Sequence, residues 1–273
     1  MSIIAKMMQA SNAEGYFDEN AEAKVCQDLV LKALSESPLC RNATIKGGVV
    51  MRSLTGDARR ATRDMDIDFI RYSLDDASIR NFIAKLNCLP HILFEQVGKT
   101  KELRQQDYHG KSVNVRISDD DDAAVNSKID FGVHNRLSIE QDEYCFDIAC
   151  FDKGANLLIN SKEQIVSEKL RSLLKFGSYS TRYKDIFDLC YLIETVNPEK
   201  LMECLQTYIF EDTSMREKNI AEVCQRIDAT FKDTRYADRV AKSRQNWLEI
   251  PATAAFSQIQ EFLQSLVNIQ RNK

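Results

Sequence analysis

The segment Asp64-Met65-Asp66-Ile67-Asp68-Phe69 alternates carboxylates with large apolar side chains. A period of two is typical of a β-strand, in which alternate side chains lie on the same face. We therefore expect Asp64, Asp66 and Asp68 on one face and the apolar side chains on the other. Carboxylates side by side repel one another unless a cation lies between them, and their oxygens suit Mg²⁺. The segment predicts a magnesium site; the solvated face of an edge strand is the alternative.

A pair of glycines, Gly47 and Gly48, precedes this strand. They separate a short strand candidate, Thr44-Ile45, from a segment of helical character at residues 49–54. Glycine lets the backbone come close to a phosphate, and the N-terminus of a helix favours anions. The arrangement predicts a phosphate-binding turn, and a simple tight turn explains the two glycines at least as well.

A further aspartate, Asp130, alternates with Ile129 and Phe131 in a second strand-like segment, residues 127–133. If the two strands are neighbours, Asp130 lies beside the first carboxylates. A glycine turn, a strand with paired aspartates and a later strand with one aspartate match a two-metal phosphoryl-transfer site. In such a site one carboxylate bridges the metals and a third activates the incoming hydroxyl, the role predicted for Asp130.

Apolar periodicity divides the chain into two parts. Helical spacing occurs at residues 21–35 and 75–88. Strand-like segments lie at residues 92–104, 111–117, 127–133 and 144–151. From Ser161 to the end the spacing is helical. This order predicts an α+β fold, with a mixed sheet and helices over residues 1–152 and an all-helical domain over residues 153–273.

The helical part contains a lysine and two aspartates of interest. Lys169 lies on the flank of an apolar helix face, where a lysine ordinarily extends its ammonium to solvent. The functional alternative is that this ammonium points toward a triphosphate. Asp185 and Asp188 are three positions apart, and Arg182 is three before Asp185. Ion pairs on a helix surface are the structural explanation for these three residues.

Four of these motifs, in chain order, resemble the AbiEii/AbiGii-type nucleotidyltransferase toxins. They are Lys46-Gly47-Gly48, Arg60-Ala61-Thr62-Arg63-Asp64-Met65-Asp66, Glu168-Lys169-Leu170 and Arg182-Tyr183-Lys184-Asp185-Ile186-Phe187-Asp188-Leu189. Each motif is weak alone, but four in order are specific, and they cover about residues 44–196. Because the second motif continues as Ile67-Asp68, the metal pair can be Asp64 and Asp66 or, in a shifted register, Asp66 and Asp68.

The resemblance implies a DNA polymerase β-like nucleotidyltransferase fold and transfer of a nucleoside monophosphate from an NTP, with Mg²⁺ or Mn²⁺ as cofactor and pyrophosphate as leaving group. It also implies the toxin of a toxin–antitoxin or abortive-infection system, with a cognate antitoxin as partner. The metal ligands expected from it are Asp64, Asp66, Asp68 and Asp130. The nucleotide-binding residues expected from it are Lys46, Gly47, Gly48, Lys169, Asp185 and Asp188.

Positive charge near these motifs bears on the acceptor. The basic residues concerned are Arg52, Arg59, Arg60, Arg63, Arg71, Lys175, Arg182 and Lys184. If they line one surface, an RNA phosphate backbone fits better than a small cation such as an aminoglycoside. The predicted acceptor is RNA, with tRNA suggested by the resemblance, or a protein. The alternatives are a small-molecule antibiotic acceptor and a non-catalytic member that only binds nucleotide or protein.

The composition is that of an ordinary globular protein: 273 residues, 44% hydrophobic and 29% charged, with a net charge of −4. No stretch approaches the roughly 18 to 20 apolar residues that span a bilayer, so we expect a cytoplasmic protein with no membrane partner. The eight cysteines are scattered without a CxxC pair, and the three histidines have no metal-ligand spacing. Zinc-site and dithiol chemistry therefore have no support in the sequence, and free buried thiols are expected.

Overall fold

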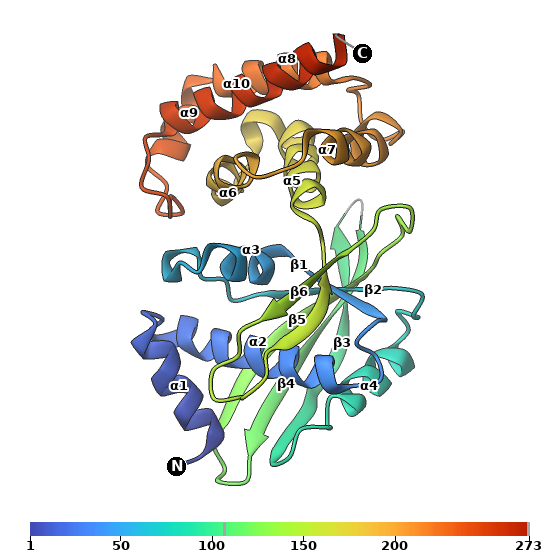
Figure 1. The fold of residues 1–273 in the computed structure, drawn as a ribbon, viewed down its shortest axis with the longest axis vertical. Helices are drawn as coiled ribbons and strands as arrows, with labels where there is room; N and C mark the ends of the chain where they lie inside the picture. The colour runs from blue at the N-terminus through green and yellow to red at the C-terminus, as the bar shows by residue number, and fades with distance from the viewer. Residues whose placement is uncertain (106–107, 272–273) are drawn as a thin grey trace. The chain divides into compact units, whose positions relative to one another are not determined.

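The computed structural model describes residues 1–105 and 108–271. The chain separates into two compact units, Met1–Asn160 and Ser161–Lys273. Figure 1 draws the first in blue to green and the second in yellow to red. The predicted α+β class is confirmed, because the strands described belong to the first unit and the second is built from helices.

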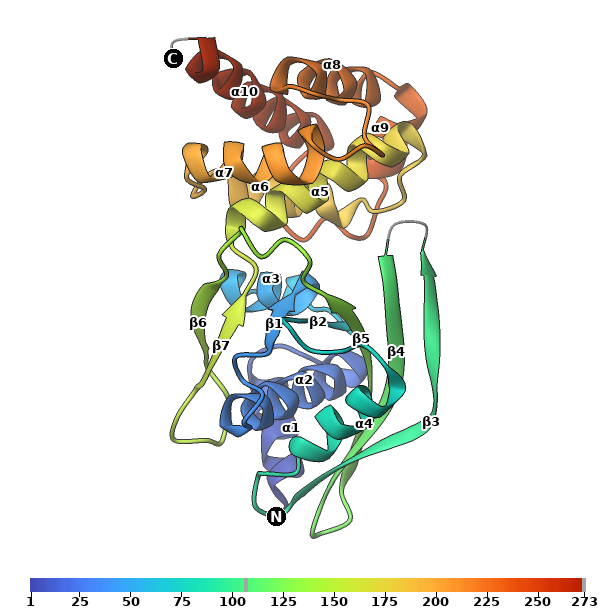
Figure 2. The ribbon, with the colours of Figure 1, turned by 90° about the vertical axis from the view of Figure 1, so that its right-hand side faces the viewer.

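A seven-stranded mixed sheet, counted over the described residues, forms the centre of the first unit, in the order β3-β4-β5-β2-β1-β7-β6. The strands are β1 Ala43–Lys46, β2 Met65–Phe69, β3 Ile92–Gln105, β4 Tyr108–Asp119, β5 Ala124–Val133, β6 Asp142–Phe146 and β7 Ala155–Ile159. The central strand β2 pairs with β1 in antiparallel and with β5 in parallel fashion. Figure 2 shows the long β3–β4 hairpin at one side of this sheet.

The alternation in β2 decides which face forms the core. Met65, Ile67 and Phe69 are fully buried. The Phe69 ring lies 5.1 Å from that of Phe82 in α4 and 5.0 Å from that of Phe131 in β5, measured between centroids. The predicted division into an apolar and a carboxylate face is therefore confirmed, and β2 is a central strand rather than an edge strand.

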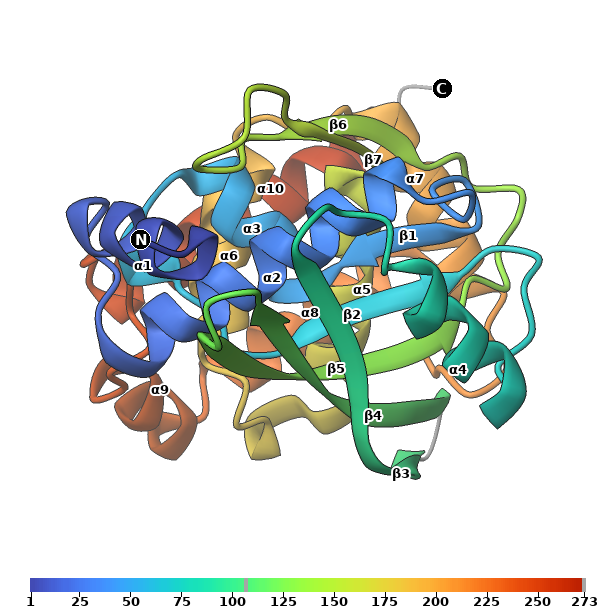
Figure 3. The same cartoon turned by 90° about the horizontal axis from the view of Figure 1, so that it is seen from below.

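Helices complete the first unit. They are α1 Ile3–Ala13, α2 Asp18–Glu36, α3 Gly47–Thr55, the short η1 Ala58–Arg60 and α4 Asp76–Lys85. The helix α2 packs against both β5 and β7, so it runs across the intervening strands (Figure 3). The expected helix at 75–88 begins as predicted, because the Asp75 side chain accepts a hydrogen bond from the backbone N–H of Ser78.

The predicted boundary at residues 152 and 153 is wrong, because the first unit extends to Asn160. The reason is β7, which the sequence reading assigned to the helical part. It pairs in parallel with β1 and in antiparallel with β6, so it belongs to the sheet. The strand expected over residues 144–151 is also shorter than predicted, since β6 ends at Phe146.

The second unit is helical over its described residues, 161–271, as predicted. Its elements are α5 Lys162–Phe176, η2 Gly177–Tyr179, α6 Lys184–Ile193, α7 Pro198–Leu205, η3 Gln206–Phe210, α8 Ile220–Phe231, α9 Thr234–Ala241 and α10 Ala252–Arg271. The long α10 packs against α6 and α8, with Ile259, Leu263 and Leu266 buried. The helix α5 starts at a side-chain cap, where Ser161 accepts a hydrogen bond from Gln164 N–H.

Among the residues described, no helix is long and apolar enough to cross a membrane. All eight cysteines are described and are free thiols. Cys26, Cys190 and Cys204 are buried, whereas Cys88, Cys145 and Cys150 are exposed, so the expectation of buried thiols holds for only part of the set.

Candidate functional site

The parallel pairing of β2 with β5 brings two predicted aspartates together. Asp66 and Asp130 are direct partners in the strand register, while Asp68 stands opposite Gly132. We call Asp64, Asp66, Asp68 and Asp130 the carboxylate cluster. The neighbouring strands predicted for Asp66 and Asp130 are confirmed, although the two segments lie more than sixty positions apart in the chain.

The cluster leaves Asp66 in an unfavourable electrostatic environment. The pKa of Asp66 is raised to about 6, chiefly by burial; Lys46 lowers it, and the charges of Asp130, Asp64 and Asp68 raise it. The other members of the cluster therefore all lie near enough to repel an ionised Asp66. Such a group is stabilised by a bound cation.

Two lysines flank the cluster. Lys46 Nζ lies 2.9 Å from Asp68 Oδ2. Lys128 Nζ lies 3.1 Å from Asp130 Oδ2 and 3.5 Å from Asp64 Oδ1, so one ammonium bridges two carboxylates. The sequence analysis missed Lys128, although its position two residues before Asp130 on the same strand could have signalled it.

The two glycines make room for the cluster and for the loop before it. A Cβ on Gly47 would lie 2.2 Å from Asp66 Oδ2, and Gly47 has a φ of +67°. A Cβ on Gly48 would lie 2.3 Å from Thr62 Oγ1. Side chains cannot be added at such distances without displacing Asp66 or Thr62. The first and second sequence motifs are therefore packed directly against each other, a reason for both glycines that the sequence did not reveal.

A buried glutamine holds the loop that leads into β2. Gln27, from the interior of α2, is fully buried. Its Nε2 donates to the carbonyl of Thr62 at 2.9 Å and to that of Asp64 at 3.4 Å. These bonds hold the backbone of residues 62–64 in place and so position Asp64. Sequence reasoning missed Gln27, which is one of several polar residues in this helical stretch and belongs to no motif.

The cluster fits a hard divalent cation by its chemistry. Over residues 1–105 and 108–271, no three or more Asp, Glu, His or Cys side chains converge into a closed set of metal ligands. The donors are nonetheless carboxylate oxygens, which Mg²⁺ and Mn²⁺ prefer. Asp130 Oδ1 is buried and has no hydrogen-bond partner among the described residues. A buried carboxylate oxygen in that state is costly without a cation or a proton.

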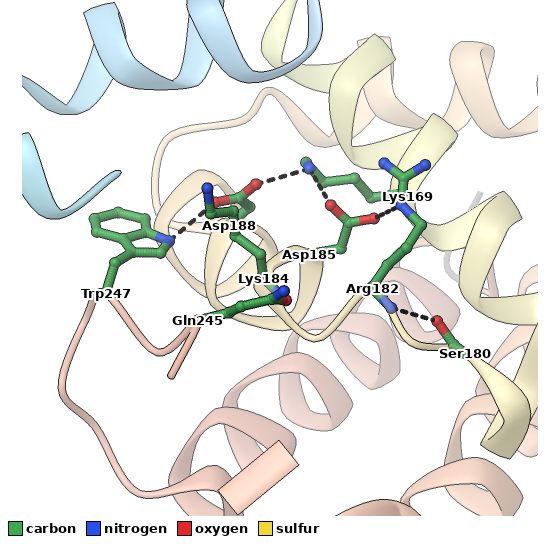
Figure 4. Close-up of polar contacts among 8 residues, drawn as sticks. All are labelled: Lys169, Ser180, Arg182, Lys184, Asp185, Asp188, Gln245 and Trp247. Carbon is green, nitrogen blue, oxygen red and sulfur yellow. Dashed lines mark hydrogen bonds and ion pairs between the residues drawn. The ribbon is translucent and has the colours of Figure 1, made fainter. Parts of the chain in front are cut away.

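A second group of predicted residues forms a buried network in the second unit (Figure 4). Lys169 is only 7% exposed, so it does not extend to solvent as a flanking lysine usually does. Its ammonium donates to Asp185 Oδ1 at 2.6 Å and to Asp188 Oδ2 at 2.8 Å. Asp185 and Asp188 are also buried, and of the helix ion pairs considered from the sequence the structure contains that of Arg182 with Asp185.

Two further side chains complete what we call the lysine network: Lys169, Arg182, Asp185, Asp188 and Trp247. Arg182 Nε donates to Asp185 Oδ2 at 2.6 Å, and Trp247 Nε1 donates to Asp188 Oδ1 at 3.0 Å (Figure 4). Burial alone would raise the pKa of Asp185, but the charges of Lys169 and Arg182 outweigh it and lower that pKa. The network therefore holds Asp185 ionised, with Lys169 and Arg182 as its cationic partners. The predicted contact of Lys169, Asp185 and Asp188 with a nucleotide stays a prediction.

The sequence analysis missed Trp247, the only tryptophan of the chain. It lies in the last 75 residues, which carry no motif that identified it as a site residue. It nevertheless donates to a motif aspartate 59 positions earlier. Side chains joined over such distances in sequence are found by the fold and not by spacing.

The arginines around the aspartates do not form the common surface considered from the sequence. Arg52 and Arg60 are buried. Arg52 Nη2 donates to Asp28 Oδ1 at 2.7 Å inside the helical layer of the first unit. Arg59 pairs with Asp57 at 2.6 Å, and Arg63 pairs with Glu19. These residues therefore give little support to an RNA-binding surface at this position.

The chain matches a known protein family. A family model described as "Nucleotidyl transferase AbiEii toxin, Type IV TA system" matches residues 29–260. None of the curated proteins matches the chain. The matched range contains the carboxylate cluster, both glycines and the whole lysine network.

Proposed function

The chain belongs to the AbiEii nucleotidyltransferase toxin family of type IV toxin–antitoxin systems, and from this membership we propose that it is an active, metal-dependent nucleotidyltransferase. It transfers a nucleoside monophosphate from an NTP to an acceptor hydroxyl. The observation that carries the proposal is the environment of Asp66. This carboxylate lies beside Asp130, and burial and the carboxylates around it raise its pKa to about 6.

Asp64, Asp66 and Asp130 would hold the metal, Mg²⁺ or Mn²⁺, which neutralises negative charge on the triphosphate as the α-phosphorus is attacked. The acceptor oxygen forms a bond to the α-phosphorus, and the bond from that phosphorus to the bridging oxygen of pyrophosphate breaks. The hydroxyl proton passes to a carboxylate, for which Asp130 Oδ1 is the candidate because it has no hydrogen-bond partner among the described residues.

Asp64 with Asp66 is favoured over Asp66 with Asp68 as the metal pair. The Asp68 carboxylate is buried and bound by Lys46. The Asp64 carboxylate is exposed and shares the Lys128 ammonium with Asp130, so it can exchange that ammonium for a metal ion. Asp68 is then a neighbour that adds negative charge.

The triphosphate would lie at the N-terminus of α3, which begins at Gly47 directly after Lys46. Backbone N–H groups there favour anions, and Lys46 adds a cation. Lys169, Asp185 and Asp188 remain proposed nucleotide-site residues on the strength of their motif alone. The acceptor is proposed to be RNA, in particular tRNA, with a protein or a small molecule as the alternative. A cognate antitoxin and a cytoplasmic location are likewise proposed.

The test is a labelling experiment with the full chain. Purified protein is incubated with each α-labelled NTP, Mg²⁺ and either total bacterial RNA or a protein extract. We expect label in RNA with the wild type and with Asp121→Asn, a matched control in an exposed loop, and no label with Asp66→Asn. Absence of transfer from every NTP to every acceptor would contradict the proposal and favour a member of the fold that only binds.

A further inference from the structure

Two exposed aromatic side chains bracket a single turn of the second unit. Phe176, the last residue of α5, is 51% exposed, and Tyr179, the last residue of η2, is 85% exposed. Isolated exposed apolar residues are common and need no explanation. Two large rings within four positions, on a turn that joins the helices of the lysine network, are a more specific feature.

The turn that carries the rings is held from several sides. Ser180 N–H donates to the Gly177 carbonyl at 3.0 Å. Arg239, from α9, donates to the Ser178 carbonyl. Gly177 has a φ of +51°, and a Cβ there would lie 3.0 Å from Arg226 Nη2 of α8. The backbone that carries the rings is therefore fixed. A ligand that binds the rings loses little free energy to ordering this backbone.

The surroundings of the rings are basic. Cations come from the turn and its flanks and from the two helices packed against it: Lys175, Arg182, Lys184, Arg226 and Arg239. Of the acidic side chains, Asp233 interacts with Ser178 and Arg239, and Asp185 is buried and bound by Lys169 and Arg182. Residues 175–184 contain three cationic side chains and no acidic one, in contrast to the net charge of −4 of the whole chain.

We propose that residues 175–182, with Arg226 and Arg239, form a binding site for single-stranded nucleic acid, in which bases stack on Phe176 and Tyr179 and the cations contact phosphates. Aromatic rings bind any base through its π-face, and surrounding cations hold the backbone. The site rests on the proposed function to the extent that an RNA acceptor would be the strand that it binds. It also places the basic surface in the second unit, whereas Arg52 and Arg60 of the first unit are buried.

Nucleic acid is favoured over a protein partner by the combination of groups. An acidic protein segment would bind the cations but would leave the two exposed rings without a role. A hydrophobic protein surface would contact the rings but would offer no negative charge to the surrounding cations. A strand of bases and phosphates uses both.

The experiment measures binding of a fluorescent 12-nucleotide RNA, and of a DNA of the same sequence, by anisotropy with the full chain and no NTP. Tyr179→Ala and the double variant Phe176→Ala/Tyr179→Ala are compared with the wild type. Phe17→Ala is the matched control, because Phe17 is an aromatic residue of the first unit that is 62% exposed. Tyr179→Trp keeps a stacking ring and serves as the rescue variant.

We expect Tyr179→Ala to weaken binding about fivefold or more, and the double variant about thirtyfold or more. Phe17→Ala should stay within about twofold of the wild type, and Tyr179→Trp should keep wild-type affinity. Binding should weaken steeply as salt increases. Since both rings are solvent-exposed, the melting temperature of each variant should match that of the wild type, which excludes unfolding as the cause.

Equal affinity in the wild type and the double variant would overturn the proposal. So would unchanged strand binding combined with lost binding to the cognate antitoxin, because the turn would then be a protein interface. The assay contains no NTP, so its result is separate from that of the labelling experiment. Strand binding without nucleotide transfer would refute the proposed function and leave this site standing.

Discussion

The carboxylate cluster of the first unit and the lysine network of the second are built from the same residue types but are electrostatic opposites. In the cluster, burial and neighbouring carboxylates raise the pKa of Asp66 to about 6. In the network, the charges of Lys169 and Arg182 lower the pKa of Asp185 despite its burial. A set of carboxylates with excess negative charge needs a further cation, whereas a neutralised set does not. This difference is the reason that we propose metal binding for the cluster and not for the network.

The largest expected effect follows from removing the central carboxylate of the cluster. Asp66→Asn should reduce nucleotide transfer at least about 1,000-fold. The metal ion that Asp66 would hold stabilises transition-state charge by several kcal/mol, and this stabilisation is lost with the ligand. The melting temperature should stay the same or rise, because a repelled carboxylate is lost. Initial rates and thermal unfolding measure the two effects.

The same assay decides between the two registers. Loss of transfer in Asp64→Ala and Asp66→Ala supports the pair that we favour. If Asp64→Ala is active while Asp66→Ala and Asp68→Ala are inactive, the shifted register is correct. Wild-type turnover in both Asp64→Ala and Asp66→Ala would refute the site.

Lys169→Ala should act mainly on stability. A lysine that extends from a helix flank into solvent contributes little to stability, but this ammonium is buried between two carboxylates. Removing one partner of a buried ion pair costs about 3 to 5 kcal/mol. We expect the lower end, because Arg182 remains with Asp185.

Urea unfolding followed by the fluorescence of Trp247 measures this loss in the second unit. Lys175→Ala on the same helix is the control, since Lys175 is not buried. A nucleotide affinity that falls ten- to a hundredfold with no loss of stability would restore Lys169 as a direct triphosphate ligand. Equal stability of the two variants would contradict the network as described.

What could be predicted from the sequence also differs between the carboxylate cluster and the lysine network. The alternation in residues 64–69 predicted the two faces of β2, and the alternation around Asp130 predicted its neighbour, because a period of two is a local property of a strand. The burial of Lys169 could not be predicted in this way, because α5 is covered there only when α6, with Asp185 and Asp188, packs against it.

Other features were missed for related reasons. Gln27 is recognised only through its bonds to the backbone of Thr62 and Asp64, which lie far from it in sequence. Lys128 could have been noticed beside Asp130, but its contact with Asp64 depends on the fold. The strand β7 is a short apolar run, which periodicity alone does not distinguish from the start of a helix. It became a strand by pairing with β1, and this pairing moved the domain boundary to Asn160.

The contributions of Asp66 and Asp185 to stability should depend on pH in opposite directions. The pKa of Asp66 is raised in the folded state, so its contribution to stability is complete below about pH 4 and is lost as the pH rises through about 6. The pKa of Asp185 is lowered, so its contribution is lost on acidification.

Thermal unfolding without divalent cations, from pH 4.5 to 7, tests the first of these effects. Asp66→Asn should gain about 2 kcal/mol over the wild type across this range, after allowance for partial exposure. Mg²⁺ should reduce the gain at pH 7, because a bound cation stabilises the ionised wild type. Parallel stability profiles of the two proteins would be inconsistent with the environment described for Asp66.

A smaller effect is expected from replacing the glycines at the two ends of α3. Gly47→Ala and Gly56→Ala both place a side chain at positive φ, +67° and +61°, but a Cβ on Gly56 meets nothing within 4 Å. Both variants should lose about 1 kcal/mol of stability. Only Gly47→Ala should also reduce transfer, by about tenfold or more, because the new Cβ displaces the Asp66 carboxylate. Equal rates for the two variants would show that Gly47 only forms a tight turn.

The most direct test of the central claim is a titration of the full chain with Mn²⁺, followed by electron paramagnetic resonance of the free ion, in the presence of a non-hydrolysable NTP analogue. We predict that the wild type and Asp185→Asn bind Mn²⁺ with similar affinity, provided that circular dichroism confirms that the variant is folded. The double variant Asp66→Asn/Asp130→Asn should lose that binding. Retention of Mn²⁺ by this double variant, or its loss in folded Asp185→Asn, would contradict the assignment of the metal to the carboxylate cluster.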